Sequence, residues 1–199
     1  MELVDIYNNR HEKLNYERER KELKEGEYRL STFIWVINDN DQILLQQRLS
    51  TTKKMPNMWG TTAGGVKSGE TSLEGAIREL KEELGINSNK EELEFIGSNK
   101  RINDFVEVWV CKKNISESEL ILDPNEVQAA KWVSIEEFEK MIENGTGINS
   151  GYDIFKIYYN NFYNRHYEII EGKPVIVKNK KLYIWFGKQY RCDKIILGG

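Results

Sequence analysis

One segment of the chain combines an apolar stripe with three closely spaced glutamates, and this combination limits its fold most strongly. In residues 71–84 the apolar side chains recur at intervals of three and four, the period of an amphipathic helix, and Gly85 follows as a stop. A second stripe of the same helix carries the carboxylates Glu79, Glu82 and Glu83. Like charges at this spacing repel each other by roughly a few tenths of a kcal/mol per pair. The pattern therefore predicts a helix that packs one face into a core and exposes three carboxylates on another.

A divalent cation would remove the repulsion between these carboxylates. Carboxylate oxygens are hard ligands, and no histidine or cysteine lies close to them in the sequence, so Mg²⁺ or Mn²⁺ suits the cluster better than Zn²⁺. Mg²⁺ usually keeps several waters and binds through a few carboxylates together with substrate phosphates. The helix therefore indicates phosphoryl or pyrophosphoryl chemistry, with Mg²⁺ as the cofactor and Mn²⁺ as the alternative.

The glutamates belong to a longer pattern with fixed spacing. Gly64 is followed after five residues by Glu70, and after seven more by the run RELKEELGI, residues 78–86. This pattern matches the Nudix box, Gly-x5-Glu-x7-Arg-Glu-U-x-Glu-Glu-x-Gly-U with U an aliphatic residue, at every specified position. On these residues the chain resembles the Nudix hydrolase superfamily, and the resemblance covers roughly residues 28–145.

The resemblance implies a Nudix fold of the α/β (α+β) class, with a mixed β-sheet sandwiched between helices and the box forming a loop, a helix and a loop. The metal ligands that it implies are the three box glutamates and the backbone carbonyl just before the box, here that of Ala63, where glycine is common. Arg78 would orient the box carboxylates, and Glu70 would brace the loop through Arg78. One of the box glutamates, or Glu126 as our candidate on a later loop, would deprotonate the attacking water.

The resemblance also implies a reaction and parts of a substrate site. The reaction is attack by a metal-activated water on one phosphorus of a nucleoside diphosphate linked to a group X. Gly64 and Gly65 would permit a tight loop whose backbone approaches phosphates. Arg48 and Lys67 are candidates to contact phosphates, and Trp59 is a candidate to stack on a base.

The identity of the substrate and two other classes of function stay open. Residues 98–104 lack the proline and the tyrosine that mark ADP-ribose and dinucleoside-polyphosphate hydrolases, and nothing selects MutT-like cleansing of damaged nucleotides. Residues 2–7 and 44–48 resemble the isopentenyl-diphosphate isomerase-like branch, which uses a cysteine just before the box and a histidine at the start of the first hairpin. This chain has TTA, residues 61–63, and Arg29 at those places, which favours hydrolysis. A catalytically silent ligand sensor would usually have lost some box glutamates, and none is substituted here.

Charge and composition exclude several other functions. The 199 residues contain 39% hydrophobic and 31% charged side chains, and their formal charge of −3 lacks the basic surplus that binding of long nucleic acid needs. The longest apolar run, near residues 30–37, is far shorter than the roughly 20 residues of a membrane span, and the polar N-terminus lacks a signal-peptide core. We therefore expect a cytoplasmic protein that binds a small diphosphate and has neither a membrane nor a long nucleic acid as partner.

Local patterns predict the remaining elements and two units. Residues 8–27 are expected to form a mixed-charge loop or a short helix. The other expected elements are a hairpin of strands 30–37 and 42–48, a short strand at 60–63, strands at 93–96, 105–112 and 129–133, a helix that begins after Ser134 and ends at Gly145, a helix over the aromatic residues 152–163, and a hairpin of 175–177 with 182–186. We expect a Nudix domain with an N-terminal extension over residues 1–145, and a helix-and-hairpin extension over 146–199 whose aromatic residues would suit a homodimer contact.

Overall fold

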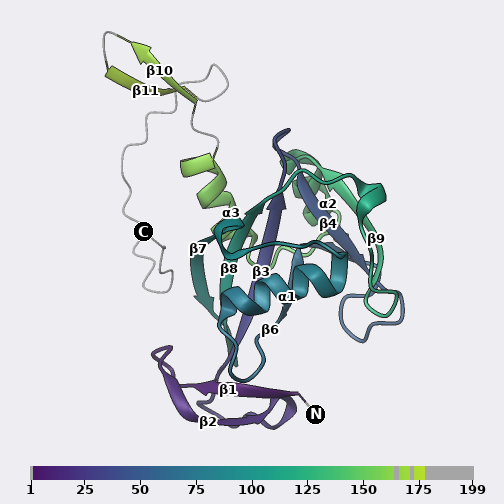
Figure 1. The fold of residues 1–199 in the computed structure, drawn as a ribbon, viewed down its shortest axis with the longest axis vertical. Coiled ribbons are helices and arrows are strands. Elements are labelled where there is room, and N and C mark those ends of the chain that lie inside the picture. The colour runs from purple at the N-terminus through teal and green to yellow at the C-terminus, as the bar shows by residue number, and fades with distance from the viewer. Residues whose placement is uncertain (1, 164–165, 171–172, 178–199) are drawn as a thin grey trace.

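The computed structural model of the protein describes residues 2–163, 166–170 and 173–177 (Figure 1). Its strands are β1 (Leu3–Tyr7), β2 (Lys13–Glu19), β3 (Arg29–Ile37), β4 (Ile43–Arg48), β5 (Trp59–Gly60), β6 (Thr62–Gly65), β7 (Leu93–Lys100), β8 (Asp104–Lys112), β9 (Val127–Val133), β10 (His166–Ile170) and β11 (Lys173–Val177). Its α-helices are α1 (Ser72–Leu84), α2 (Ile135–Glu143) and α3 (Tyr152–Tyr158). None of the helices in this part of the chain is long and apolar enough to cross a membrane.

A seven-stranded mixed sheet forms the centre of the molecule. Its strands lie in the order β5-β4-β3-β8-β7, with β6 paired to β3 and β9 paired to β4. The pair β3 and β8 is parallel, whereas β3 pairs antiparallel with β4 and β6. The predicted hairpin of residues 30–37 and 42–48 is confirmed by the pairing of β3 with β4. The mixed sheet and its flanking helices also confirm the predicted fold class.

Helices cover both faces of the sheet, and the two larger of the three core clusters lie on opposite faces. Neighbouring residues of a strand point to opposite faces, so Trp35 of β3 lies in the cluster with α2 and α3, and Ile34 lies in the cluster under α1. Trp35 is fully buried and stacks on Phe155 of α3 with ring centroids 4.6 Å apart. Because both faces are covered, β3 is buried along almost its whole length.

Helix α1 begins and ends where the sequence predicts. Thr71 caps its N-terminus by accepting a hydrogen bond from the backbone N–H of Glu74, whose carboxylate accepts in return from the backbone N–H of Thr71. Gly85 ends the helix with a φ of 71°, in the left-handed region that favours glycine. A Cβ at Gly85 would also lie 2.7 Å from the Cβ of Ile121. These local constraints fix the position of α1 between the loops that precede and follow it.

The expectation of a loop or short helix over residues 8–27 is wrong for residues 13–19, whereas a short 3₁₀ helix does follow at Arg20–Glu22. Strand β2 covers residues 13–19 and pairs antiparallel with β1. Its residues are mostly exposed, so it has no apolar alternation that a sequence pattern could detect, and its cross-strand contacts are ionic, such as Lys13 Nζ to Asp5 Oδ2 at 2.6 Å. Asp5 also accepts a hydrogen bond of 3.0 Å from the backbone N–H of Gly69. The hairpin of β1 and β2 is therefore attached to the loop that precedes α1.

The C-terminal elements agree with the sequence analysis in part. The predicted helix over 152–163 is α-helical over Tyr152–Tyr158 and continues as a π-helical turn over Tyr159–Tyr163. The predicted strand at 175–177 lies in β11, which pairs antiparallel with β10, and its predicted partner at 182–186 lies outside the described residues. The boundary between the two expected units, near residue 145, stays a prediction.

The substitution Phe155→Ala tests whether α3 belongs to the cooperative core. Loss of the ring that stacks on Trp35 should lower the free energy of unfolding by roughly 3–5 kcal/mol, the usual range for such a change in a core. Urea denaturation followed by tryptophan fluorescence measures this change. Ile157→Ala, at a 37% exposed position of the same helix, is the matched control and should cost less than about 1 kcal/mol. Equal effects of the two substitutions would contradict the assignment.

Candidate active site

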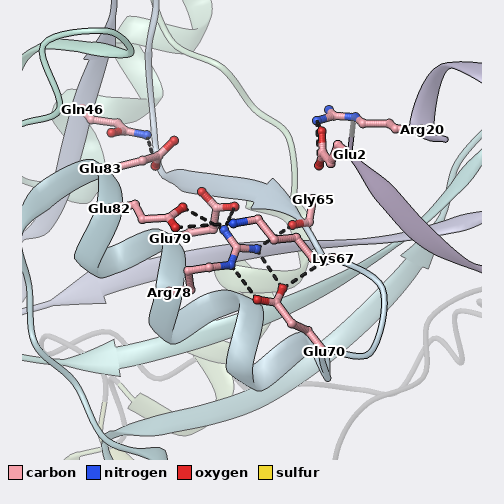
Figure 2. Close-up of polar contacts among 10 residues, drawn as sticks. All are labelled: Glu2, Arg20, Gln46, Gly65, Lys67, Glu70, Arg78, Glu79, Glu82 and Glu83. Carbon is pink, nitrogen blue, oxygen red and sulfur yellow. Dashed lines mark hydrogen bonds and ion pairs between the residues drawn. The ribbon is translucent and has the colours of Figure 1, made fainter.

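Arg78 joins the loop before α1 to two carboxylates of the helix (Figure 2). Its guanidinium donates two hydrogen bonds to Glu70, from Nε to Oε1 at 2.7 Å and from Nη2 to Oε2 at 2.9 Å. Nη1 lies 2.7 Å from Glu79 Oε1 and 2.9 Å from Glu82 Oε2. Nη2 also donates to the carbonyl of Gly65 at 2.9 Å. A planar guanidinium has enough donors for all of these acceptors, so one side chain sets the position of both the loop and the carboxylates.

The expectation of three exposed carboxylates is wrong for Glu79 and Glu83. The side chain of Glu82 is 49% exposed, whereas that of Glu79 is 12% exposed and Glu83 is 4% exposed. The reason is that α1 packs against β6 and beside β4, so the glutamate stripe faces the junction between the helix and these strands. Gln46 of β4 donates from Nε2 to Glu83 Oε2 at 2.7 Å, and the backbone N–H of Ala63 on β6 donates to the same carboxylate.

Burial leaves these carboxylates poorly solvated. Loss of solvent, followed by the negative charge of Glu79, raises the pKa of Glu83 to about 8, against the opposing hydrogen bond from Gln46. Burial also raises the pKa of Glu79, although its bond to Arg78 acts in the opposite direction. The charge of Glu126 raises the pKa of both residues, so this exposed carboxylate lies near enough to act on the buried pair. The carboxylates of this cluster outnumber Arg78 and Lys67, the cations that contact them.

Gly64 leaves free the space that the Glu79 carboxylate occupies. It pairs with Thr32 of β3, and a Cβ at Gly64 would overlap the Glu79 carboxylate. Its φ does not lie in the left-handed region, so space and not backbone conformation requires glycine here. Ala63 also has an ordinary strand conformation without positive φ. Alanine therefore fits at the position before the box without backbone strain.

The donor chemistry of this cluster fits a hard divalent cation. As the side chains stand, the described residues contain no group of three or more acidic, histidine or cysteine side chains placed to hold an ion. The reason is that Arg78 holds Glu79 and Glu82 while Gln46 holds Glu83. Oε1 of Gln46 is buried and has no hydrogen-bond partner within the described chain, which adds an unused acceptor beside Glu83. A cation would relieve the uncompensated charge if the carboxylates turned toward it.

A pocket of about 480 Å³ opens beside the carboxylates. Gln46, Ala63 and Gly64 line the part of the pocket that adjoins the glutamates of α1. The pocket contains one carboxylate, that of Asp104, and five cationic side chains, which are Arg20, Arg29, Arg48, Lys54 and Arg101. This excess of positive charge suits an anionic ligand.

The structure brings some of the predicted substrate-site residues to this pocket and leaves others outside it. Arg48 lines the pocket, as predicted for a phosphate contact. Lys67 lies outside it, with Nζ 3.5 Å from Glu82 Oε1, beside the carboxylates. Trp59 does not line the pocket either, because its side chain packs against the core with Lys131 Nζ 4.9 Å from the ring centroid. Stacking of a base on Trp59 therefore has no support in the described pocket.

The sequence analysis missed Arg20, Arg29, Lys54 and Arg101. These residues are brought together by strand register and by loops, and not by their spacing in the sequence. Arg29 begins β3 and Asp104 begins β8, and the parallel register places the two residues opposite each other. Arg29 Nη2 lies 3.4 Å from Asp104 Oδ2, and Arg101 Nε donates to Asp104 Oδ1 at 2.8 Å. Arg20 follows the N-terminal hairpin, and Lys54 lies on the loop after β4. The only local signal was an arginine directly before the apolar run of β3.

Comparison with known proteins identifies similar chains and folds. A sequence model of the NUDIX domain matches residues 27–149. An uncharacterised Nudix hydrolase of Listeria monocytogenes is 33% identical over 131 residues, which is 63% of this chain and 75% of that protein. A crystal structure from Deinococcus radiodurans has a TM-score of 0.64 and 22% identity, covering 79% of this chain and 99% of its own.

A second solved structure combines a similar fold with a nucleotide and a metal ion. It is a bifunctional NMN adenylyltransferase/ADP ribose pyrophosphatase from Francisella tularensis, complexed with AMP and a Mn ion. Its TM-score is 0.52 at 21% identity, and the match covers 66% of this chain and 41% of that chain. At this level of identity the likeness concerns the fold.

The substitution Gly64→Ala tests the space between β6 and α1. The added methyl group should displace the Glu79 carboxylate and weaken Mn²⁺ binding by roughly 10- to 100-fold, as loss of a supporting contact at a metal site does. Electron paramagnetic resonance of free Mn²⁺ measures the affinity. Gly65→Ala is the control, because its Cβ would meet the end of the exposed Glu2 side chain at 3.0 Å, which can move. Unchanged Mn²⁺ affinity in Gly64→Ala would contradict the role of Glu79.

The burial of the Glu83 carboxyl group predicts how the stability of the metal-free protein depends on pH. Its pKa is raised from 4.5 to about 8 on folding, so in this range the folded protein holds a proton that the unfolded chain has lost. The free energy of unfolding is therefore unaffected by the titration of this group below about pH 4.5. It decreases as the pH rises from there to about 8, by at most roughly 1.4 kcal/mol per pH unit.

Urea denaturation in the presence of a chelator measures this slope. Glu83→Gln should flatten it, whereas Glu82→Gln, which removes a half-exposed carboxylate from the same helix, should leave it in place. A slope that survives in Glu83→Gln would assign the effect to another group.

Proposed function

Because the chain belongs to the Nudix family of hydrolases, we propose that it cleaves the diphosphate linkage of a nucleoside diphosphate joined to a second group X. The observation that carries this proposal is the contact between the buried glutamates of α1 and the cationic pocket, since Gly64 and Gln46 adjoin both. Positive charge in the pocket attracts phosphates, and the carboxylates supply ligands for the cation that a diphosphate substrate needs. The Francisella tularensis protein, named an ADP ribose pyrophosphatase, provides a precedent for this substrate class on a similar fold.

The proposed cofactor is Mg²⁺, with Mn²⁺ as the alternative. Glu79, Glu82 and Glu83 would hold it together with the carbonyl of Ala63, and the Francisella tularensis protein whose fold is similar was solved with a Mn ion. When bound, such an ion lowers the pKa of water and stabilises negative charge on phosphate oxygens. The bidentate contact of Arg78 with Glu70 keeps the loop in place while the other carboxylates turn away from the guanidinium.

Glu126 is the proposed base that takes a proton from the attacking water. Its carboxylate is exposed, yet its charge acts on both buried glutamates, so it lies at the open side of the cluster. The backbone around it is fixed, because its carbonyl accepts from the N–H of Leu49 at 3.1 Å and its N–H donates to the carbonyl of Asp123 at 3.2 Å. A fixed backbone and an exposed carboxylate suit a group that accepts a proton and returns it to solvent.

The residues of this chain do not favour the isomerase alternative. The positions just before the box are threonine and alanine, with no thiol among them. His11 stacks on Phe105 with ring centroids 4.1 Å apart and lies 3.6 Å from Glu107, and it does not line the described pockets. Arg29 binds Asp104 at the start of the first hairpin. None of these positions therefore presents a thiol or an imidazole to the described pocket.

Release of phosphate or nucleotide products from a panel of nucleoside triphosphates, dinucleotides, nucleotide sugars and isoprenoid diphosphates tests the proposal. We expect cleavage of a nucleotide class that requires Mg²⁺ or Mn²⁺ and stops with a chelator. Glu82→Gln and Glu83→Gln should reduce the rate by roughly 10²-fold or more, because each removes a ligand of the cation. Glu143→Gln, on an exposed position of α2, is the control. Silence across the panel, with Mn²⁺ binding intact, would favour a ligand sensor.

The substitution Glu126→Gln tests the proposed base separately from the metal ligands. Loss of a general base should slow turnover by roughly 10²- to 10⁴-fold. The melting temperature and the Mn²⁺ affinity should stay near those of the wild type, since the side chain is exposed. The profile of log kcat against pH should also lose its acidic limb. An unchanged rate would remove Glu126 from the reaction.

A further inference from the structure

The cationic pocket extends away from the glutamates toward the N-terminal hairpin. A second pocket of about 540 Å³ shares Arg20, Arg29, Lys54 and Asn103 with the first one, so the two form a continuous depression. Arg20 directly follows β2, and its backbone N–H donates to the carbonyl of Glu2 at 3.0 Å, which fixes its position. The depression therefore continues beyond the region where a diphosphate would meet the glutamates of α1.

The floor of this depression is a buried ion cluster with more positive than negative charge. Asp104 is 2% exposed and serves two guanidinium groups, those of Arg29 and Arg101. The hydroxyl of Ser31 donates to the same carboxylate at 2.9 Å. One carboxylate between two arginines leaves a positive charge in excess, and the side chain of Arg29 is only 12% exposed.

The lining of the second pocket carries four cations, Arg20, Lys21, Arg29 and Lys54, against two carboxylates, Glu2 and Glu19, so positive charge remains in excess. Arg20 Nη1 lies 3.1 Å from Glu2 Oε2, and Figure 2 shows this pair apart from the glutamates of α1. Lys54 is exposed, and the described residues place no carboxylate within ion-pair distance of its ammonium group. Burial, and then repulsion from Arg20, lowers the pKa of Arg29, which shows that these guanidinium groups lie close enough to oppose each other. A bound anion would remove this repulsion.

We propose that this part of the pocket binds a phosphate group of the substrate that does not belong to the hydrolysed linkage, and that Arg20 and Lys54 select for it. Guanidinium groups bind phosphate oxygens with paired, charge-assisted hydrogen bonds, and several of them meet here from different elements. The inference rests on the proposed function, which it makes more specific. The favoured substrates are diphosphates whose group X ends in a phosphate, such as nucleoside triphosphates, over those whose group X is a neutral sugar.

Calorimetric titration with inorganic phosphate, in a chelator and at low salt, tests the site without relying on catalysis. The full chain should bind phosphate, and Arg20→Gln and Lys54→Gln should each weaken the affinity by about tenfold, which corresponds to about 1.4 kcal/mol. The two variants alter different walls, so misfolding of one would not remove the test. Lys24→Gln and Lys53→Gln are the matched controls, because they remove one charge from the neighbouring segments without lining either pocket. Absent phosphate binding, or equal affinity in all variants, would overturn the inference.

A kinetic comparison separates this inference from the proposed function. With a nucleoside triphosphate, Arg20→Gln should raise KM by about tenfold, whereas with UDP-glucose, whose group X is neutral, KM should stay within about twofold. Equal increases with both substrates would overturn the selective role of Arg20. If no substrate is cleaved while phosphate binding depends on Arg20 and Lys54 as described, the phosphate site stands and the proposed hydrolysis fails.

Discussion

The site depends on the hydrogen bonds that the guanidinium of Arg78 donates. This guanidinium carries one positive charge among several carboxylates, and it binds acceptors that belong to three separate pieces of chain. Glu70 and the carbonyl of Gly65 lie before the helix, while Glu79 and Glu82 lie on it. The loop and the helix therefore cannot move apart without breaking charge-assisted hydrogen bonds. The carboxylates are kept close together, against their repulsion, before any cation arrives.

The two-sided core explains why this arrangement is held in place. Helix α1 packs its apolar face on Ile34 and the residues around it, while Trp35, the next residue of β3, anchors α2 and α3 on the opposite face. A shift of the side chains packed on one face of β3 therefore also affects the packing on the other face, because neither face of this strand is exposed to solvent. The glutamates are set at the edge of this packed layer, where Gly64 and Gln46 determine how close the helix can lie to the strands.

The parts of the fold and site that were predictable from sequence are those fixed by neighbours in the chain. Thr71 and Gly85 define α1 locally, and the resemblance to the Nudix box implied the contact between Glu70 and Arg78. The burial of Glu83 was not predictable. A helical pattern shows which residues share a face of the helix, but not which strand packs against that face. The same limit applies to β2, whose exposed residues lack a pattern, and to Arg29, which meets Asp104 only through the register of two parallel strands.

The residues that would bind the cation and the residue proposed to select the ligand lie on separate parts of the chain. The glutamates that would perform the chemistry lie in one short helix, whereas Arg20 reaches the pocket from a hairpin fastened by Asp5 to the backbone of Gly69. Exposed side chains of β2 can therefore vary without altering the helix or its capping residues. If Arg20 selects the ligand as we propose, substitutions in the segment that carries it would change which molecules bind and leave the glutamates of α1 unaltered.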